Sequence, residues 1–510
     1  MTQLHYEYDI PKGTVLLSLQ QILQFAFSFI FYVVVARILT RSEVGQISLL
    51  AFIMSVFTVV TQLSLPTAAT RFIAERVGAG KNREASAIGH TTLKLLILIS
   101  APALLVSYII SPNLSTIIFG QTELNQLLPL TFISAFILDL TTLYGAQLLG
   151  LGLYSKMVLQ NIVYIPLSRS LGLILAYTGL KVTGIVLGWL IAALITLAAS
   201  LILVRGRFEK ASSFPSKILI SYSLPLLAFA LIGIIQGWAD LTLLYAFTSN
   251  LPATGTYYIV ISSASVFSIL WAPLTNAIFP ALSSRYGKEG ATTLQNTLVA
   301  TIRLINTSII PLSIAAAAVS PLLLQLAYGE AYTNGALPFS IIASTIILQA
   351  YTAFILITLQ AIGRTTLLLS LGAASAAIEI LALAFMAKPF GAAGASIART
   401  LLFATTVILG YLYLRKDIQL KFTPALAKSL AMGISIAIPL GITDFYLAQY
   451  ISHALVIRGV TTASLFISLF VLTARRLQIL HNSDFNLLRQ AFSTSVHRPI
   501  NLAEKLLVHP

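Results

Sequence analysis

Apolar residues occur in long runs along most of the chain, and short polar segments separate these runs. An α-helix needs about 20 apolar residues to cross the hydrocarbon core of a membrane. A transmembrane β-strand needs only about 10 residues of alternating polarity, so runs of this length favour helices. The pattern predicts about 14 membrane-spanning helices, over residues 14–36, 45–66, 92–111, 125–148, 157–178, 182–204, 218–248, 254–281, 304–327, 336–361, 366–387, 391–414, 429–450 and 457–474.

The composition supports an all-α polytopic membrane protein. Of the 510 residues, 57% are hydrophobic and only 9% are charged. A soluble protein of this length needs a charged surface, whereas a polytopic membrane protein does not. The absence of cysteine excludes a disulfide framework and a cysteine-ligated metal. The N-terminus has no basic segment followed by a cleavage site, so we expect the first apolar span to be retained.

The formal net charge of +15 is distributed unevenly between alternate loops. One set of loops carries Arg71, Arg76, Lys81, Arg83, Lys94, Lys156, Arg205, Arg207, Lys210, Lys217, Arg285, Lys288, Arg303, Arg364, Arg415, Lys416, Lys421 and Lys428. The alternate set carries only Arg37, Arg41, Lys181, Lys388 and Arg458. Loops rich in lysine and arginine stay on the cytoplasmic side of the membrane, so we expect the first set of loops and both termini to be cytoplasmic. The charge therefore indicates topology and contact with anionic lipids rather than nucleic-acid binding.

The chain contains an internal repeat with an offset of about 210 residues. Matching positions include Gly45 with Gly255, Ser-Val-Phe at 55–57 with the same tripeptide at 265–267, and Gly184 with Gly394. Each repeat holds six predicted spans, and an even number gives both halves the same orientation. We predict one lobe over residues 1–210, a second over 211–420, two added helices within 421–474, and a cytoplasmic tail over 475–510. Within the tail, residues 484–492 would form a short surface helix or remain disordered.

Several stretches resemble a known family by their order and spacing. They are Leu-Thr-Arg-Ser-Glu-Val-Gly at 39–45, Leu-Pro-Thr-Ala-Ala-Thr-Arg-Phe-Ile-Ala-Glu at 65–75, Ala-Asp-Leu-Thr-Leu-Leu-Tyr at 239–245, Tyr-Gly-Glu-Ala-Tyr at 328–332 and Lys-Pro-Phe-Gly-Ala-Ala-Gly-Ala-Ser-Ile-Ala at 388–398. The chain resembles the Wzx-like oligosaccharide flippases, which form the polysaccharide transporter branch of the MOP exporter superfamily, to which the MATE exporters also belong. The resemblance covers about residues 14–415.

The resemblance implies a fold and a function. The fold would be two six-helix lobes in a V around a central cavity, and the two added helices fit the fourteen-helix branch of the superfamily. The function would be a transporter rather than an enzyme. It would move a lipid-linked oligosaccharide, on a polyprenyl phosphate or pyrophosphate carrier, from the inner to the outer leaflet of the cell membrane by alternating access. We expect a monomer whose partners are this substrate and membrane lipids.

Ionisable side chains at membrane depth are costly and need a partner or a function. Asp240 and Glu379 are predicted to form a coupling-cation site for Na⁺ or H⁺, with Ser375 one helical turn from Glu379. The resemblance supports this site, because some members of the superfamily place acidic residues on the corresponding helices. Alternatively, Arg399 neutralises Glu379 in a structural pair. No other cofactor or metal is expected.

A cation in the first lobe is the candidate for binding the phosphate of the substrate. Arg169 would donate a forked pair of charge-assisted hydrogen bonds to a phosphate or pyrophosphate. The further candidates for this headgroup site are Arg37, Gln20, Gln21 and Gln24. Alternatively, Arg169 pairs with Asp139, and Arg37 extends to the interface from its helix end.

Other functions are less consistent with the sequence. There is no GxxxxGK[ST] nucleotide loop, so the chain is not expected to hydrolyse ATP. The histidines are scattered outside the deep membrane region, so no metal cluster is expected. A cation-coupled multidrug exporter and a membrane-embedded polysaccharide polymerase or ligase stay open as alternatives. Arginines within the membrane and short outer loops favour the flippase.

Overall fold

The structure of the chain is a computed structural model. It describes residues 10–118, 120, 122–209, 211, 213–272, 291–361, 364–415, 424–450, 454–479, 485, 489 and 497–507. These ranges are almost entirely helical and contain no β-strand, which confirms the all-α prediction. The chain divides into two compact units, Met1–Tyr258 and Ile259–Pro510, and each is described by itself.

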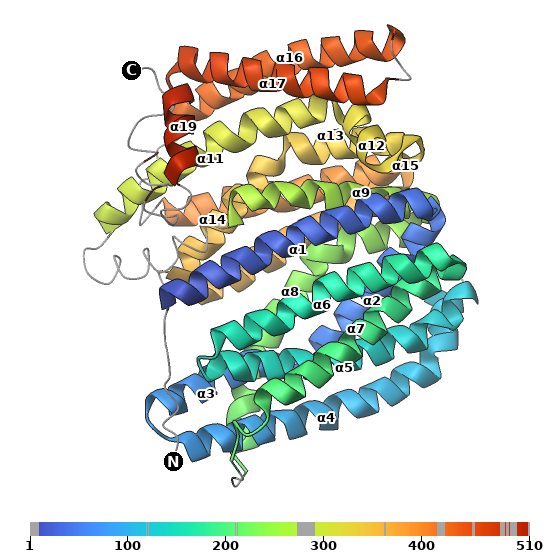
Figure 1. Cartoon of the computed structure of the whole chain (residues 1–510), viewed down its shortest axis with the longest axis vertical. Coiled ribbons are helices and arrows are strands. Elements are labelled where there is room, and N and C mark those ends of the chain that lie inside the picture. Colours follow the sequence, from blue (N-terminus) through green and yellow to red (C-terminus); the bar gives the residue numbers. More distant parts are fainter. Residues whose placement is uncertain are drawn as a thin grey trace. The chain divides into compact units, whose positions relative to one another are not determined.

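The first unit consists of long helices joined by short connections (Figure 1). Its helices are α1 (Ile10–Ile38), α2 (Arg41–Gln62), α3 (Leu65–Gly78), α4 (Asn82–Asn113), α5 (Leu127–Gly150), α6 (Tyr154–Leu175), α7 (Lys181–Val204), α8 (Ser216–Thr248) and the first half of α9 (Leu251–Ser265). Short segments η1 (Leu114–Ile118), η2 (Thr122–Asn125) and η3 (Ala176–Leu180) connect some of them.

The second unit begins within α9. It continues with η4 (Val266–Leu270), α11 (Ala291–Ala318), α12 (Ser320–Tyr328), η5 (Glu330–Gly335), α13 (Ala336–Ser344), α14 (Ile346–Ala361), α15 (Thr365–Leu414), α16 (Pro424–Tyr450), α17 (Leu455–Leu477) and α19 (His497–Leu507). Two of its predicted spans are bent, by 80° between α11 and α12 and by 42° between α13 and α14.

The helices are long and apolar enough for a multi-pass membrane protein. Among the residues that the structure describes, ten helical stretches could cross a membrane by their length and composition, or up to 12 if each bent pair is one span. Two of the ten, Tyr154–Val204 and Thr366–Leu414, have 51 and 49 residues, which is about twice the length that one crossing needs. Each reverses at a non-helical glycine, Gly179 or Gly391. The predicted number of 14 stays a prediction.

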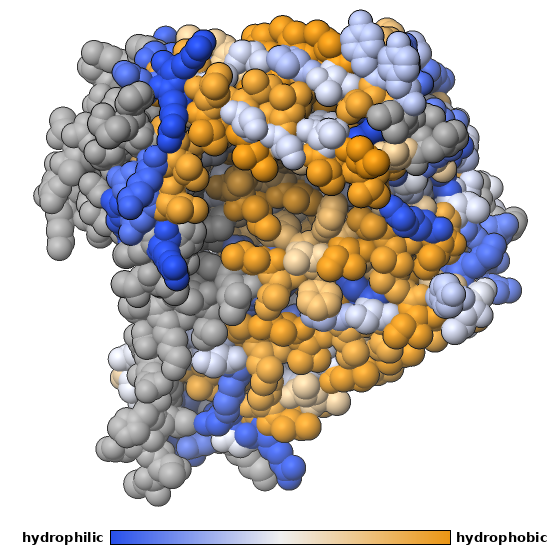
Figure 2. Space-filling model, turned by 45° about the horizontal axis from the view of Figure 1, so that its top comes forward, coloured by the Kyte–Doolittle hydropathy of each residue, from blue (hydrophilic) through white to orange (hydrophobic). Residues whose placement is uncertain are grey.

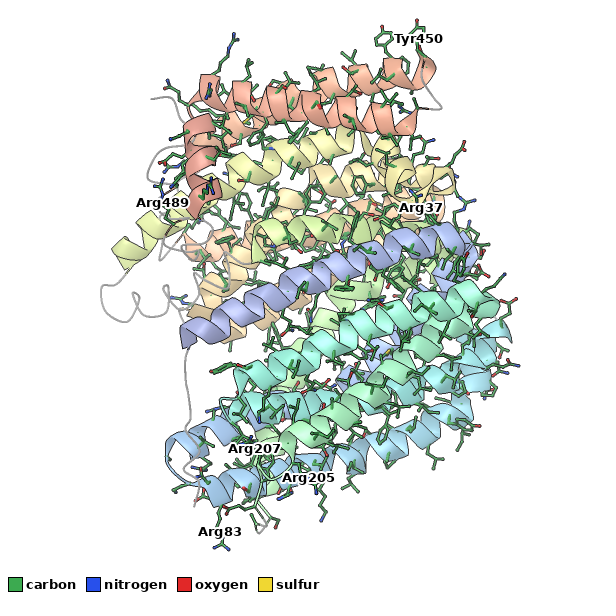
Figure 3. All side chains as sticks on the ribbon, in the orientation of Figure 1. Arg37, Arg83, Arg205, Arg207, Tyr450 and Arg489 are labelled. Atoms are coloured by element: carbon green, nitrogen blue, oxygen red, sulfur yellow. The ribbon has the colours of Figure 1, made fainter. Side chains whose placement is uncertain are left out.

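The surface agrees with this class of protein. Figure 2 shows hydrophobic residues over most of the central part of one face, and hydrophilic residues gathered toward its left and right sides. In the first unit, Arg83, Arg205 and Arg207 lie at one end of the helices and Arg37 lies at the other (Figure 3). This separation agrees with the loop assignment, whereas the orientation in the membrane stays a prediction.

The predicted span over residues 45–66 is interrupted in the structure. Helix α2 ends at Gln62, and Leu63 and Ser64 adopt left-handed conformations with φ of 46° and 57°. Helix α3 then begins with Pro66 in its first turn. Proline lacks a backbone N–H, but the N–H groups of a first helical turn have no partner within the helix, so no hydrogen bond is lost. The basic segment after residue 70, which was interpreted as a loop, is therefore part of a helix that buries one face in the unit's core.

Each unit repeats the same helix reversal, which supports the internal duplication. Lys181 has φ 47° and ψ −125°, and Gly391 has φ 53° and ψ −131°. A Cβ atom on Gly184 would lie 2.6 Å from the backbone N of Ala176, and one on Gly394 would lie 2.7 Å from the carbonyl C of Met386. Lys181 and Gly391 are about 210 residues apart, as are Gly184 and Gly394, and this is the offset of the internal repeat. The lobe limits near residues 210 and 420 stay predictions.

A buried ion pair joins the two added helices. Arg458 Nη2 of α17 lies 2.7 Å from Asp444 Oδ1 of α16, and the two residues are only 5% and 7% exposed. Removing one member of a buried ion pair leaves the other charge uncompensated, which costs about 3–5 kcal/mol.

We therefore expect Asp444→Ala to lower the thermal unfolding temperature of the detergent-purified protein. The double variant Asp444→Leu/Arg458→Met should recover most of this loss, because apolar residues of similar size remove both charges. An unfolding temperature that Asp444→Ala leaves unchanged would show that the pair does not stabilise α16 and α17.

The tail forms a helix that the sequence analysis did not predict. Most of the predicted helix at 484–492 lies outside the described residues, whereas α19 covers His497–Leu507. Arg475 Nε of α17 donates to the carbonyl O of Leu506 at 2.6 Å. Leu507 packs against the core shared by α16 and α17. Helix α19 thus lies across the ends of these two helices (Figure 1).

Candidate functional site

Arg169 is a cation held on aromatic rings inside the first unit. It lies on α6, and its guanidinium carbon is 4.3 Å from the ring centre of Phe31 and 5.6 Å from that of Tyr32, both on α1. Phe31 is only 1% exposed. Such cation–π contacts stabilise a charge without neutralising it. Within the described ranges, no carboxylate lies within ion-pair distance of Arg169.

The rings beneath Arg169 belong to a larger aromatic cluster. The hydroxyls of Tyr32 and Tyr258 lie 2.9 Å apart, and Trp238 of α8 stacks on Tyr258 with ring centres 6.3 Å apart. Phe52 of α2 contacts Trp238 at 6.1 Å. The sequence analysis missed this cluster. Among 27 phenylalanines and 20 tyrosines, no spacing marks these as neighbours.

Asp139 does not pair with Arg169. It is fully buried on α5, and its two oxygens accept hydrogen bonds from Thr61 Oγ1 at 2.6 Å and from Gln62 Nε2 at 2.9 Å. Both donors lie in the last turn of α2, immediately before the left-handed residues. The interpretation of an Arg169–Asp139 pair is wrong, because Asp139 faces α2 whereas Arg169 faces α1.

The other candidates for the headgroup site are spread along α1. Gln20 is 8% exposed, Gln21 and Gln24 are half-buried, and Arg37 is exposed in the last turn. At 1.5 Å per residue, Gln24 and Gln20 lie about 10 and 17 Å along the axis from the ring of Phe31. Arg37 lies about 9 Å beyond that ring in the other direction. Only Arg169 itself is thus placed at the aromatic cluster, and the role of the others stays a prediction.

Asp240 has a partner that the sequence analysis missed. This aspartate is fully buried on α8, and Tyr257 Oη of α9 donates to its Oδ2 at 2.7 Å. The backbone N–H of Leu241 donates to its Oδ1 at 2.8 Å.

Glu379 and Ser375 lie one turn apart on α15 of the second unit, and both are fully buried. Ser375 Oγ donates to the carbonyl O of Leu371 at 2.8 Å, and Arg399 lies over the ring of Phe403 at 5.7 Å. Asp240 belongs to the first unit, so the three-residue cation site and the Arg399–Glu379 pair both stay predictions. No group of three or more histidine and acidic side chains in the described part of the chain could hold a metal ion.

Comparison with known proteins identifies relatives of this chain. The family described as "Polysaccharide biosynthesis protein" matches residues 10–285. A protein of Haloferax volcanii described as "Probable low-salt glycan biosynthesis flippase Agl15" is 23% identical over 421 residues, which cover 81% of this chain and 85% of the relative.

Solved structures of membrane transporters share the fold. The inward closed conformation of the lipid II flippase MurJ has a TM-score of 0.73 and 13% identity, and covers 90% of this chain and 98% of MurJ. An inward-facing MATE multidrug transporter of the MOP superfamily has a TM-score of 0.63 and 15% identity, and covers 78% of this chain and 94% of the transporter. At these identities the likeness shows the fold alone.

Proposed function

Because the chain belongs to the family of polysaccharide biosynthesis proteins, we propose that it is a flippase for a lipid-linked oligosaccharide. The curated relative is itself named a glycan biosynthesis flippase, and the fold is shared with a lipid II flippase. Both names describe transporters rather than enzymes. The substrate would be a glycan on a polyprenyl phosphate or pyrophosphate carrier, and it would pass from the inner to the outer leaflet of the cell membrane by alternating access.

Arg169 is the observation that carries this proposal. Its guanidinium is held on the rings of Phe31 and Tyr32, and it has no carboxylate partner within the described ranges. The donors of the guanidinium fork therefore suit the phosphate of a lipid carrier, which they would bind by charge-assisted hydrogen bonds. An exporter of cationic drugs would need an acid at this place instead.

Deletion of the gene tests the proposal directly. Without the flippase, lipid-linked glycan should accumulate on the cytoplasmic leaflet, where a membrane-impermeant enzyme added to inside-out vesicles can cleave it. Inside-out vesicles prepared in the same way from cells that carry the intact gene are the control. Equal amounts of cytoplasm-facing glycan in both would refute the proposed function.

The coupling of transport to a cation gradient is part of the proposal. We expect Asp240→Asn and Glu379→Gln each to abolish the dependence of transport on Na⁺ or H⁺, because each removes a charge that would bind the ion. Both carboxylates are fully buried, so protein levels in the membrane need to be compared first. Gradient-dependent transport that persists in both variants would rule out a coupling role for these acids.

A further inference from the structure

The first unit contains a cavity of about 490 Å³ between α3, α5 and α6. This volume lies within the range of about 300–1,000 Å³ that is typical of small-molecule sites. It is separate from the aromatic cluster, because none of the rings that contact Arg169 lines it.

Eight of the 15 residues that line the cavity carry neutral side chains that can form hydrogen bonds, and apolar residues make up most of the remainder. The neutral polar residues include Thr67 of α3, Thr141 and Thr142 of α5, and Gln160, Asn161 and Tyr164 of α6. The spacing of three and four residues places Asn161, Gln160 and Tyr164 on one face of α6. Arg71 is the one charged residue of the lining, and its guanidinium lies 4.4 Å from the ring centre of Tyr222. With no carboxylate in this lining, the cavity does not suit a cationic ligand.

Gln160 presents an acceptor whose partner is absent from the described part of the chain. Its side chain is 1% exposed, and its Nε2 donates to the carbonyl O of Thr141 at 2.6 Å. Its Oε1 has no hydrogen-bond partner there. Gly145 makes room for this oxygen, because a Cβ at that position would lie 3.1 Å from it. Buried acceptors of this kind are uncommon in native proteins and call for an explanation.

A sugar ring satisfies these requirements. Its hydroxyls can donate to an amide oxygen such as Gln160 Oε1 and to the oxygens of Thr141 and Thr142, whose own hydroxyl hydrogens donate to backbone carbonyls of α5, and they can accept from amide N–H groups. Tyr164 also lines the cavity, and an aromatic ring combines a large apolar surface with a polar hydroxyl. We infer that this cavity binds one sugar residue of the glycan, with Gln160 as its buried acceptor. The inference rests on the proposed function and adds a glycan subsite to it.

Binding to the purified full-length protein tests the inference. The probes are farnesyl phosphate and the same lipid phosphate that carries one glucose, galactose, mannose or N-acetylglucosamine residue. The wild-type protein should bind at least one glycosylated probe about tenfold more tightly than farnesyl phosphate, as one or two new hydrogen bonds would give.

Two variants should remove this preference without changing the affinity for farnesyl phosphate. Gln160→Met keeps the length of the side chain but loses the acceptor, and Thr142→Trp fills the cavity from an exposed position. The matched control is Leu159→Trp, which introduces the same side chain on α6 at a position that is 53% exposed. It should bind all probes as the wild-type protein does.

The outcomes separate this inference from the proposed function. A wild-type protein without preference for any glycosylated probe, or variants that weaken all probes equally, would overturn the glycan subsite. Cells that lack the gene could still accumulate cytoplasm-facing glycan in that case. A sugar preference that the two variants remove would support the subsite, even if deletion of the gene left the glycan distribution unchanged.

Discussion

Replacement of Arg169 by alanine is expected to lower the transport of lipid-linked glycan by at least about 100-fold. Two charge-assisted hydrogen bonds to a phosphate contribute about 1.5–3 kcal/mol each, and their loss raises the transport barrier by their sum. In this variant the rings of Phe31 and Tyr32 should keep their positions, because their packing does not require the guanidinium that lies against them. Cytoplasm-facing glycan in inside-out vesicles measures the effect.

Arg169→Lys and Arg37→Ala are the informative controls. Lysine keeps the charge but lacks the planar fork, so it should transport at a rate between those of the wild-type protein and Arg169→Ala. Arg37 is exposed in the last turn of α1, about 9 Å along the helix axis from the aromatic cluster, so its loss should lower transport less than the loss of Arg169 does. Unchanged transport by Arg169→Ala at an unchanged protein level would remove the proposed role of this residue.

The membrane-spanning helices were predictable because the signal is local. An apolar run of sufficient length indicates a span wherever it lies, and α1, α4 and α8 cover the residues that the pattern gives them. The break after α2 was not predictable. It depends on the left-handed conformations of Leu63 and Ser64, and neither residue type favours positive φ. Only the proline at position 66 pointed to an interruption.

The partners of the buried charges could not be predicted for a different reason. Sequence gives the depth of a side chain in the membrane through the helical rise, but not the direction in which it points. Asp139 and Arg169 lie at comparable depth, and α5 directs the first toward Thr61 of α2 while α6 directs the second toward Phe31 of α1. These helices are apolar on nearly all sides, so no amphipathic pattern fixes their rotation. By contrast, Ser375 and Glu379 share one helix, and their spacing of one turn could be predicted.

The repeat predicts which residues correspond, and the structure shows that two corresponding glycines meet. A Cβ on Gly45 of α2 would lie 2.6 Å from the carbonyl O of Leu251, and one on Gly255 of α9 would clash with the carbonyl O of Arg41. Arg41 and Leu251 are also about 210 residues apart. The contact is therefore reciprocal within the first unit, with each glycine against the backbone of the other helix.

Substitution at this crossing is expected to be strongly destabilising. Because the opposing atoms are backbone, they cannot move aside as a flexible side chain would, and overpacking of this kind costs about 1–3 kcal/mol or more. We expect Gly255→Ala to lower the thermal unfolding temperature of the purified protein and Gly255→Leu to prevent accumulation of folded protein. Gly233→Ala is the matched control on α8, because nothing lies within 4 Å of the added Cβ. It should be neutral or stabilising, since alanine favours the helix by about 1 kcal/mol.

The double variant Gly45→Ala/Gly255→Ala decides whether the contact is reciprocal. If moving α2 and α9 apart relieves both clashes at once, the double variant should lose less stability than the two single variants lose together. Independent sites would instead give additive losses. Additive effects, or a Gly255→Ala protein as stable as the Gly233→Ala control, would contradict the close crossing of these equivalent helices.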